Sequence, residues 1–127
     1  MTKIQSIMVP GEREPISHYC HVVRAGGLVW LSGAVGIKAD GSIPADTVEQ
    51  FRVALASLDN CLKAAGGKPE HIVKVTIYLT DVKDRSRINP VRQKYFGAHR
   101  PASTLISVAA LALPELKVEI DAQAVVA

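Results

Sequence analysis

Apolar and polar positions change their spacing several times along the chain, and each spacing predicts an element. Between Asp46 and Ala65, apolar residues recur every three or four positions, which predicts a helix with a single apolar face. Asp46, followed three residues later by Glu49, forms a capping box, and Gly66-Gly67 favours a left-handed end. The helix over 46–65 is therefore the clearest element of the sequence.

A spacing of two predicts strands elsewhere. Alternation is clearest over 116–126, where apolar residues alternate with charged and polar ones. Gly26-Gly27 between two strand-like runs predicts a hairpin. A second helix is expected over roughly 86–96; because Pro90 is typical of a first helical turn, a start near Asn89 after a looser turn is the alternative. The expected bounds are strands at 3–9, 21–24, 28–32, 72–79 and 104–109, and a second helix over 86–96.

After the first short strand, the order of elements is β-β-α-β-α-β-β, which is an α+β arrangement. Crossover connections are right-handed, and this places both helices on one face of the sheet. The other face has no cover within the chain, although it carries apolar residues too. An uncovered apolar sheet face predicts burial against another subunit, so we expect an oligomer. The apolar residues expected on that face are Leu28, Trp30, Ile72 and Leu105.

Composition places the chain among ordinary globular domains. Its 127 residues, 48% apolar and 21% charged, are enough for a single domain over 1–127 with its own core. Cys20 and Cys61 are too few for a disulfide framework. Met1 to Met8 does not resemble a signal peptide, and no run reaches the roughly 18 apolar residues of a membrane span. We therefore expect a soluble, cytoplasmic protein without a membrane partner.

The net charge of +3 is mild and is spread along the chain, with one denser run over 83–94. That run is interpreted as a solvated helix face, so a nucleic-acid partner is not expected. His18 and His21 lie three apart on a strand or loop, a spacing that does not bring two ligands to one face, and no CxxC or HExxH motif occurs. Gly33 and Gly36 do not form a phosphate-binding motif, so neither a metal nor a cofactor is expected.

Glu119 is the strongest candidate for acid–base chemistry. It lies in the middle of the last strand, on the face that the helices leave bare. Burial of that face in an oligomer would desolvate the carboxyl and raise its pKa, which suits proton transfer near neutral pH. An exposed acid paired with Lys117 is the alternative interpretation, and spacing alone favours it somewhat.

Short segments in a specific order run through nearly the whole chain. The segment Tyr19-Cys20-His21 precedes a strand that continues into Ser32-Gly33, and Asn89 lies in the second helix. The other segments are Lys63-Ala64-Ala65-Gly66-Gly67, Val73-Lys74-Val75-Thr76, Asp81, Tyr95-Phe96, Pro101-Ala102, Val108-Ala109, Leu113-Pro114 and Val118-Glu119-Ile120. Taken in this order, they resemble the Rid (YjgF-type) deaminase family.

The resemblance implies a chorismate-mutase-like fold and a homotrimer with small-molecule clefts between its subunits. It also implies hydrolysis of 2-imino or 2-enamino acids to 2-oxo acids and ammonia, without metal or cofactor. Tyr19 and Asn89 correspond to cleft residues, and Gly33 to the glycine whose backbone approaches the ligand. Glu119 corresponds to the acid that positions the attacking water, and Leu105 is placed among the substrate-binding residues.

One position departs from the family pattern. Where the family has Pro-Ala-Arg-Ser, this chain has Pro101-Ala102-Ser103-Thr104, so Ser103 replaces the arginine that binds the substrate carboxylate. A serine offers a neutral hydrogen bond in place of a charged bidentate pair. The lost charge-assisted contact is worth about 1.5–3 kcal/mol of binding free energy. We therefore expect 2-imino acids to bind roughly one to two powers of ten more weakly than they would with the arginine present. Arg100 is one candidate for supplying the missing charge from another direction, but a strand residue three positions from Ser103 faces the opposite side, so a surface arginine is the favoured interpretation. His21 replaces a glutamine that is usual in the family.

Three functions stay open from the sequence. The first is a hydrolytic deaminase of imine or enamine intermediates, that is of 2-imino or 2-enamino acids or related C–N compounds, with Ser103 in place of the arginine that binds the usual carboxylate. The second is a non-catalytic trimer that binds a small molecule on the same scaffold. The third is an endoribonuclease-type translation inhibitor, which the scattered basic charge and the 5% aromatic content do not favour. We expect the deaminase.

Overall fold

The computed structural model describes residues 2–126, and its elements follow the predicted order. The second helix spans Arg85–Phe96, after a short 3-10 turn that Asp81 caps, which confirms the expected range of 86–96. The alternative start near Asn89 is wrong, and Pro90 lies inside the helix. The strands and helices are β1 (Ile4–Ile7), β2 (Val22–Ala25), β3 (Leu28–Val35), α1 (Thr47–Ala64), β4 (Ile72–Leu79), α2 (Arg85–Phe96), β5 (Ala102–Ser107) and β6 (Val118–Val125).

The long helix α1 is built as its sequence predicts. The Asp46 side chain accepts a hydrogen bond from the backbone amide of Glu49 and caps the first turn. Gly66 has φ of +86°, a left-handed conformation that favours glycine, and the chain leaves the helix there. Both ends of α1 are therefore fixed by local chemistry.

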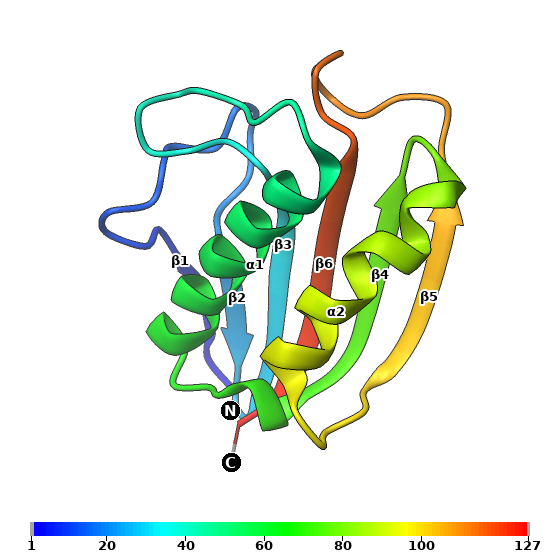
Figure 1. Cartoon of the computed structure of the whole chain (residues 1–127). Helices are drawn as coiled ribbons and strands as arrows, with labels where there is room; N and C mark the ends of the chain where they lie inside the picture. The colour runs from blue at the N-terminus through cyan, green and yellow to red at the C-terminus, as the bar shows by residue number, and fades with distance from the viewer. Residues whose placement is uncertain (1, 127) are drawn as a thin grey trace.

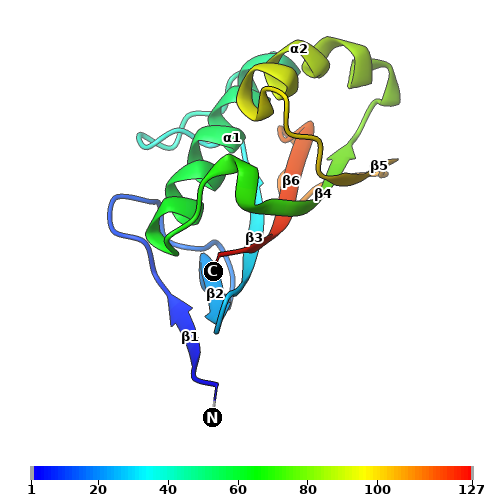
Figure 2. The ribbon, with the colours of Figure 1, turned by 90° about the horizontal axis from the view of Figure 1, so that it is seen from below.

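The strands form one six-stranded sheet in the order β1-β2-β3-β6-β4-β5. All neighbours are antiparallel except β4 and β5, which are parallel because α2 connects them as a crossover. The last strand of the chain, β6, thus lies in the middle of the sheet. Both helices pack on the same face, as predicted, and no helix or strand formed by residues 2–126 covers the opposite face (Figure 1, Figure 2).

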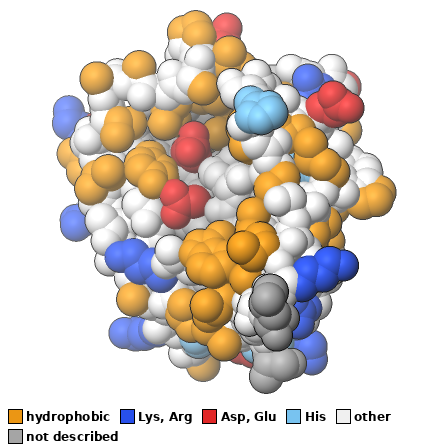
Figure 3. All heavy atoms as spheres, turned by 180° about the vertical axis from the view of Figure 1, so that it is seen from behind, with side chains coloured by type: hydrophobic (Ala, Val, Ile, Leu, Met, Phe, Trp, Pro, Cys, Tyr) orange, Lys and Arg blue, Asp and Glu red, His pale blue; other side chains and the backbone are white. Residues whose placement is uncertain are grey.

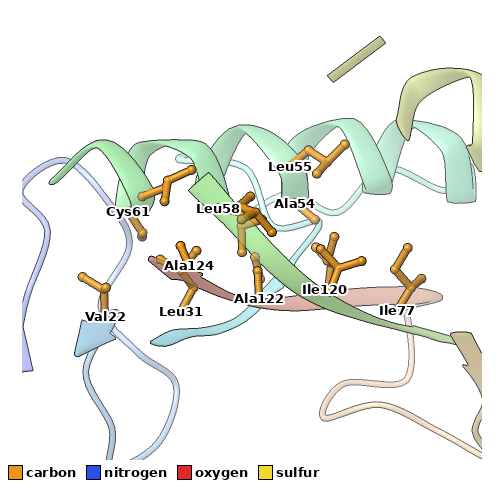
Figure 4. Packing of buried hydrophobic residues seen from close by; sticks show 14 of the residues in the cluster. Val22, Leu31, Ala54, Leu55, Leu58, Cys61, Ile77, Ile120, Ala122 and Ala124 are labelled. Atoms are coloured by element: carbon orange, nitrogen blue, oxygen red, sulfur yellow. The ribbon is translucent and has the colours of Figure 1, made fainter. Parts of the chain in front are cut away.

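The core lies between the helices and the sheet. Side chains from α1, among them Leu55 and Leu58, point towards Leu31 of β3 and Ile120 of β6 (Figure 4). Cys61 belongs to this cluster, as predicted, and burial raises the pKa of its thiol to about 12. A thiol with so high a pKa carries almost no thiolate at neutral pH, so Cys61 is a packing residue.

The face without helices carries apolar residues, but two of the four residues predicted to lie on it point to the helix side instead. Leu28 and Trp30 are exposed there, at 49% and 41%. Ile72 is instead fully buried beneath the helices, because an irregularity between Ile72 and Lys74 turns Val73 outward in its place. Leu105 also packs against the core, since its pairing with Ile77 turns it to the helix side. The exposed large apolar residues of this open face are Ile4, Leu28, Trp30, Val73, Ile106 and Val125.

Candidate functional site

Glu119 lies on the open face of β6, between Val35 of β3 and Tyr78 of β4. Burial raises the pKa of its carboxyl, and the nearby Asp121 carboxylate adds to the rise. The pKa of Glu119 is therefore raised, as predicted, by the burial that a single chain already provides. Such a carboxyl exchanges protons closer to neutral pH than an ordinary glutamate does.

A bulge in β3 brings Gly33 against this carboxyl. The register of β3 against β6 shifts between Leu31 and Ala34, so Ser32 and Gly33 leave the regular ladder. A Cβ atom at residue 33 would lie 2.8 Å from the carboxyl carbon of Glu119, closer than Cβ atoms approach other atoms in proteins. A larger residue at position 33 would have to displace the acid.

Tyr19 joins Gly33 and Glu119 around one hollow. Tyr19 comes from the loop between β1 and β2, and its side chain is partly exposed. Acidic side chains lie among hydrophobic ones near the middle of the open face (Figure 3). The hollow is lined by Ile16, Ser17, Tyr19, Ser32, Gly33, Val35, Ala112, Leu116 and Glu119.

His21 holds the loop that carries Tyr19. Its Nδ1 accepts a hydrogen bond from the Val9 amide at 2.8 Å, so the ring hydrogen is on Nε2, which donates to the Arg13 carbonyl at 2.8 Å. Ser32 ties the same loop to β3 by donating from its hydroxyl to the Cys20 carbonyl at 2.6 Å. His21 thus has a structural role that its position in the sequence did not indicate.

A hydrogen-bonded pair beside Glu119 was also absent from the sequence-based expectations. The Tyr78 hydroxyl donates to the Asp121 carboxylate at 2.6 Å, and this bond, with burial, raises the pKa of Tyr78 to about 12. Asp121 lies two residues beyond Glu119 on the same strand, hence on the same face. The alternation in β6 is the sequence signal that places Asp121 beside Glu119. The hydrogen bond from Tyr78 to Asp121 is predictable only when β6 is known to lie beside β4.

The other residues named by the resemblance lie elsewhere in the chain. Asn89 is exposed on α2, where it lines a second hollow. Ser103 is exposed on β5 and pairs with Val75, a core residue, which places it on the helix side of the sheet. Leu105 follows on that side and packs against the core. One chain therefore places Asn89, Ser103 and Leu105 apart from the hollow around Glu119.

Among residues 2–126, no group of three or more His, Cys, Asp or Glu side chains is arranged to hold a metal ion. In that same part of the chain, neither helix has the length and apolarity needed to cross a membrane.

Comparison with known proteins identifies the family. Residues 11–126 match the family model described as endoribonuclease L-PSP. The chain belongs to this family. It includes the Rid (YjgF-type) proteins, so the resemblance drawn from the segments is confirmed.

Relatives of this Rid-family chain cover it almost completely. It is 34% identical over 123 residues to a RutC family protein of Aquifex aeolicus, spanning 94% of the chain and 98% of the relative. It is 35% identical over 124 residues to Reactive Intermediate Deaminase A, chloroplastic, of Arabidopsis thaliana, spanning 94% of the chain and 66% of the relative. The crystal structure of the YjgF gene product of Escherichia coli has a TM-score of 0.88 at 30% identity, covering 95% and 98% of the two chains. The chorismate-mutase-like fold is therefore confirmed.

Proposed function

We propose that this Rid-family protein hydrolyses the C–N bond of an imine or enamine to a carbonyl compound and ammonia. The observation that carries the proposal is the Glu119 carboxyl, whose pKa is raised, in a hollow beside Gly33 and Tyr19. A relative at 35% identity carries the name of a reactive intermediate deaminase, which supports the same reaction type.

The proposed reaction needs water and one carboxyl. The Glu119 carboxylate accepts a proton from water as the water oxygen bonds to the imine carbon, and it passes that proton to the imine nitrogen to give a neutral carbinolamine. The carboxylate then accepts the proton of the carbinolamine hydroxyl and passes it to the nitrogen, so that the C–N bond breaks as the C=O bond forms, and ammonia leaves. An enamine enters the same sequence after protonation at carbon. No step of this scheme draws on a metal or cofactor.

We infer that the complete site forms between subunits of a homotrimer. Glu119 lies on the open face, whereas Asn89 and Ser103 lie on the helix side, so one chain alone does not bring them together. The exposed apolar residues of the open face, Leu28 and Trp30 among them, support a subunit contact there. The substrate would bind in the cleft where the two groups meet.

The substitution Glu119→Gln tests the proposed reaction. The amide is nearly isosteric but does not accept a proton from water, so we expect turnover of freshly generated imines to fall at least a hundredfold. Circular dichroism and light scattering should report an unchanged fold and mass. Full turnover by the variant would reduce Glu119 to a structural residue. Binding by the wild type without turnover would favour the non-catalytic trimer.

A further inference from the structure

The second hollow of the chain lies between α2 and the segment that leads into β5. Arg92, Arg100 and Asn89 are among its lining residues, with Phe96 and Pro101. None of the described residues in this lining is acidic. The hollow therefore combines two guanidinium groups with an apolar surface and no compensating carboxylate.

Arg92 has a different environment from Arg87 of the same helix, which is paired with two carboxylates. Arg87 donates to Asp46 at 2.6 Å and to Asp84 at 2.9 Å. Arg92 is half-buried, and burial lowers the pKa of its guanidinium. Within residues 2–126, no carboxylate or carbonyl is paired with it. A half-buried cation without a partner is costly, and a bound anion removes that cost.

The neighbours of Arg92 supply further donors at suitable places. Asn89 lies three residues before Arg92 and four before Gln93, so these side chains share one face of the helix. Two side-chain amides therefore flank the guanidinium, and Arg100 faces the hollow from the following segment. A planar guanidinium with adjacent amide donors matches the two or three oxygens of a small oxyanion.

We propose that this hollow binds a small oxyanion, a carboxylate or a phosphate group, with Arg92 as its charged ligand. Pro101 lines the hollow, and Ser103 follows two residues later in β5, paired with the core residue Val75 and hence on the helix side of the sheet. Arg92 of α2 thus supplies a positive charge on the side of the sheet where Ser103 replaces the family's arginine. That the oxyanion belongs to the substrate rests on the proposed function; that the hollow binds one does not.

Calorimetric titration of the full chain tests the site, with pyruvate and inorganic phosphate as probes against chloride at equal ionic strength. We expect saturable binding by the wild type and at least a tenfold loss in Arg92→Gln, the loss typical of one charge-assisted contact. Arg85→Gln is the matched control, since Arg85 is exposed on the same helix outside the hollow. Tighter binding of pyruvate would assign a carboxylate group, and tighter binding of phosphate a phosphate group.

Three results would overturn the proposal: no saturable binding of either probe, unchanged affinity in Arg92→Gln, or an equal loss in Arg85→Gln. A trimer that dissociates in Arg92→Gln, combined with no probe binding by the wild type, would assign Arg92 to a contact between subunits. The titration is independent of turnover. If the wild type binds the probes through Arg92 but hydrolyses no imine, the site stands and the proposed reaction fails.

Discussion

His21 illustrates how much a single side chain fixes. Its neutral ring joins two backbone positions of one loop, Val9 and Arg13, because one ring nitrogen accepts and the other donates. A glutamine amide also has one acceptor and one donor group, so it meets the same two requirements. The loop fixed in this way carries Tyr19 to the hollow over Glu119.

We therefore predict that His21→Ala lowers the free energy of unfolding by about 1–3 kcal/mol, because two backbone groups lose their partner. His21→Gln should restore most of this loss. Urea unfolding followed by circular dichroism measures both variants. His18→Ala, at an exposed position in the same loop, is the control and should change little. Equal losses in the glutamine and alanine variants would contradict a role based on the two hydrogen bonds.

Ser103 offers the second test at this scale. We expect the wild type to turn over simple 2-imino acids slowly and Ser103→Arg to raise kcat/KM about 10–100-fold, because an arginine restores a charged bidentate contact. Ser107→Arg serves as the control, because it places the same charge four residues further along β5, on the same face of the strand. A wild type that already matches the rate of Ser103→Arg would show that Ser103 does not limit this activity.

Among the elements, β6 holds two carboxyls on one face. Asp121 raises the pKa of Glu119, and the carboxylate form of Glu119 is the base in the proposed reaction. The rate should therefore fall as the pH drops through this raised pKa. Removing the charge of Asp121 lowers the pKa of Glu119 and extends the active range to more acidic pH.

We accordingly predict that Asp121→Asn moves the acid limb of the kcat/KM profile to lower pH. Asp59→Asn is a close control, because Asp59 also accepts a tyrosine hydroxyl, from Tyr95 at 2.9 Å, but lies on α1 away from the hollow. An unmoved acid limb in Asp121→Asn would mean that another group titrates in that profile.

The elements also mark what the sequence can predict. Helix α1 was predictable because its cap, its apolar spacing and its final glycine are all local. The inward turn of Ile72 was not, because it depends on a bulge against β6. The same limit applies to the site: segments indicated Tyr19, Gly33 and Glu119, whereas the pairing of Tyr78 with Asp121 follows from the order of strands.

For the molecule as a whole, the open sheet face predicts the assembly. We expect light scattering at micromolar concentration to give three times the 13.6 kDa of one chain. Trp30→Glu puts a charge into that face, so it should yield monomers and, with the cleft lost, no turnover. Val82→Glu, at an exposed apolar residue outside the sheet, should leave the mass unchanged. A monomeric wild type would refute the assembly.

The place of β6 in the sheet has a consequence for how the protein is made. Synthesis delivers the strands in chain order, yet β6, the strand that joins β3 to β4, is made after the other five. Until then the nascent chain holds only a β1-β2-β3 ribbon and a β4-β5 pair, with no hydrogen bonds between them. The sheet thus closes only once β6 has left the ribosome, and deletion of β6 would divide it into two halves.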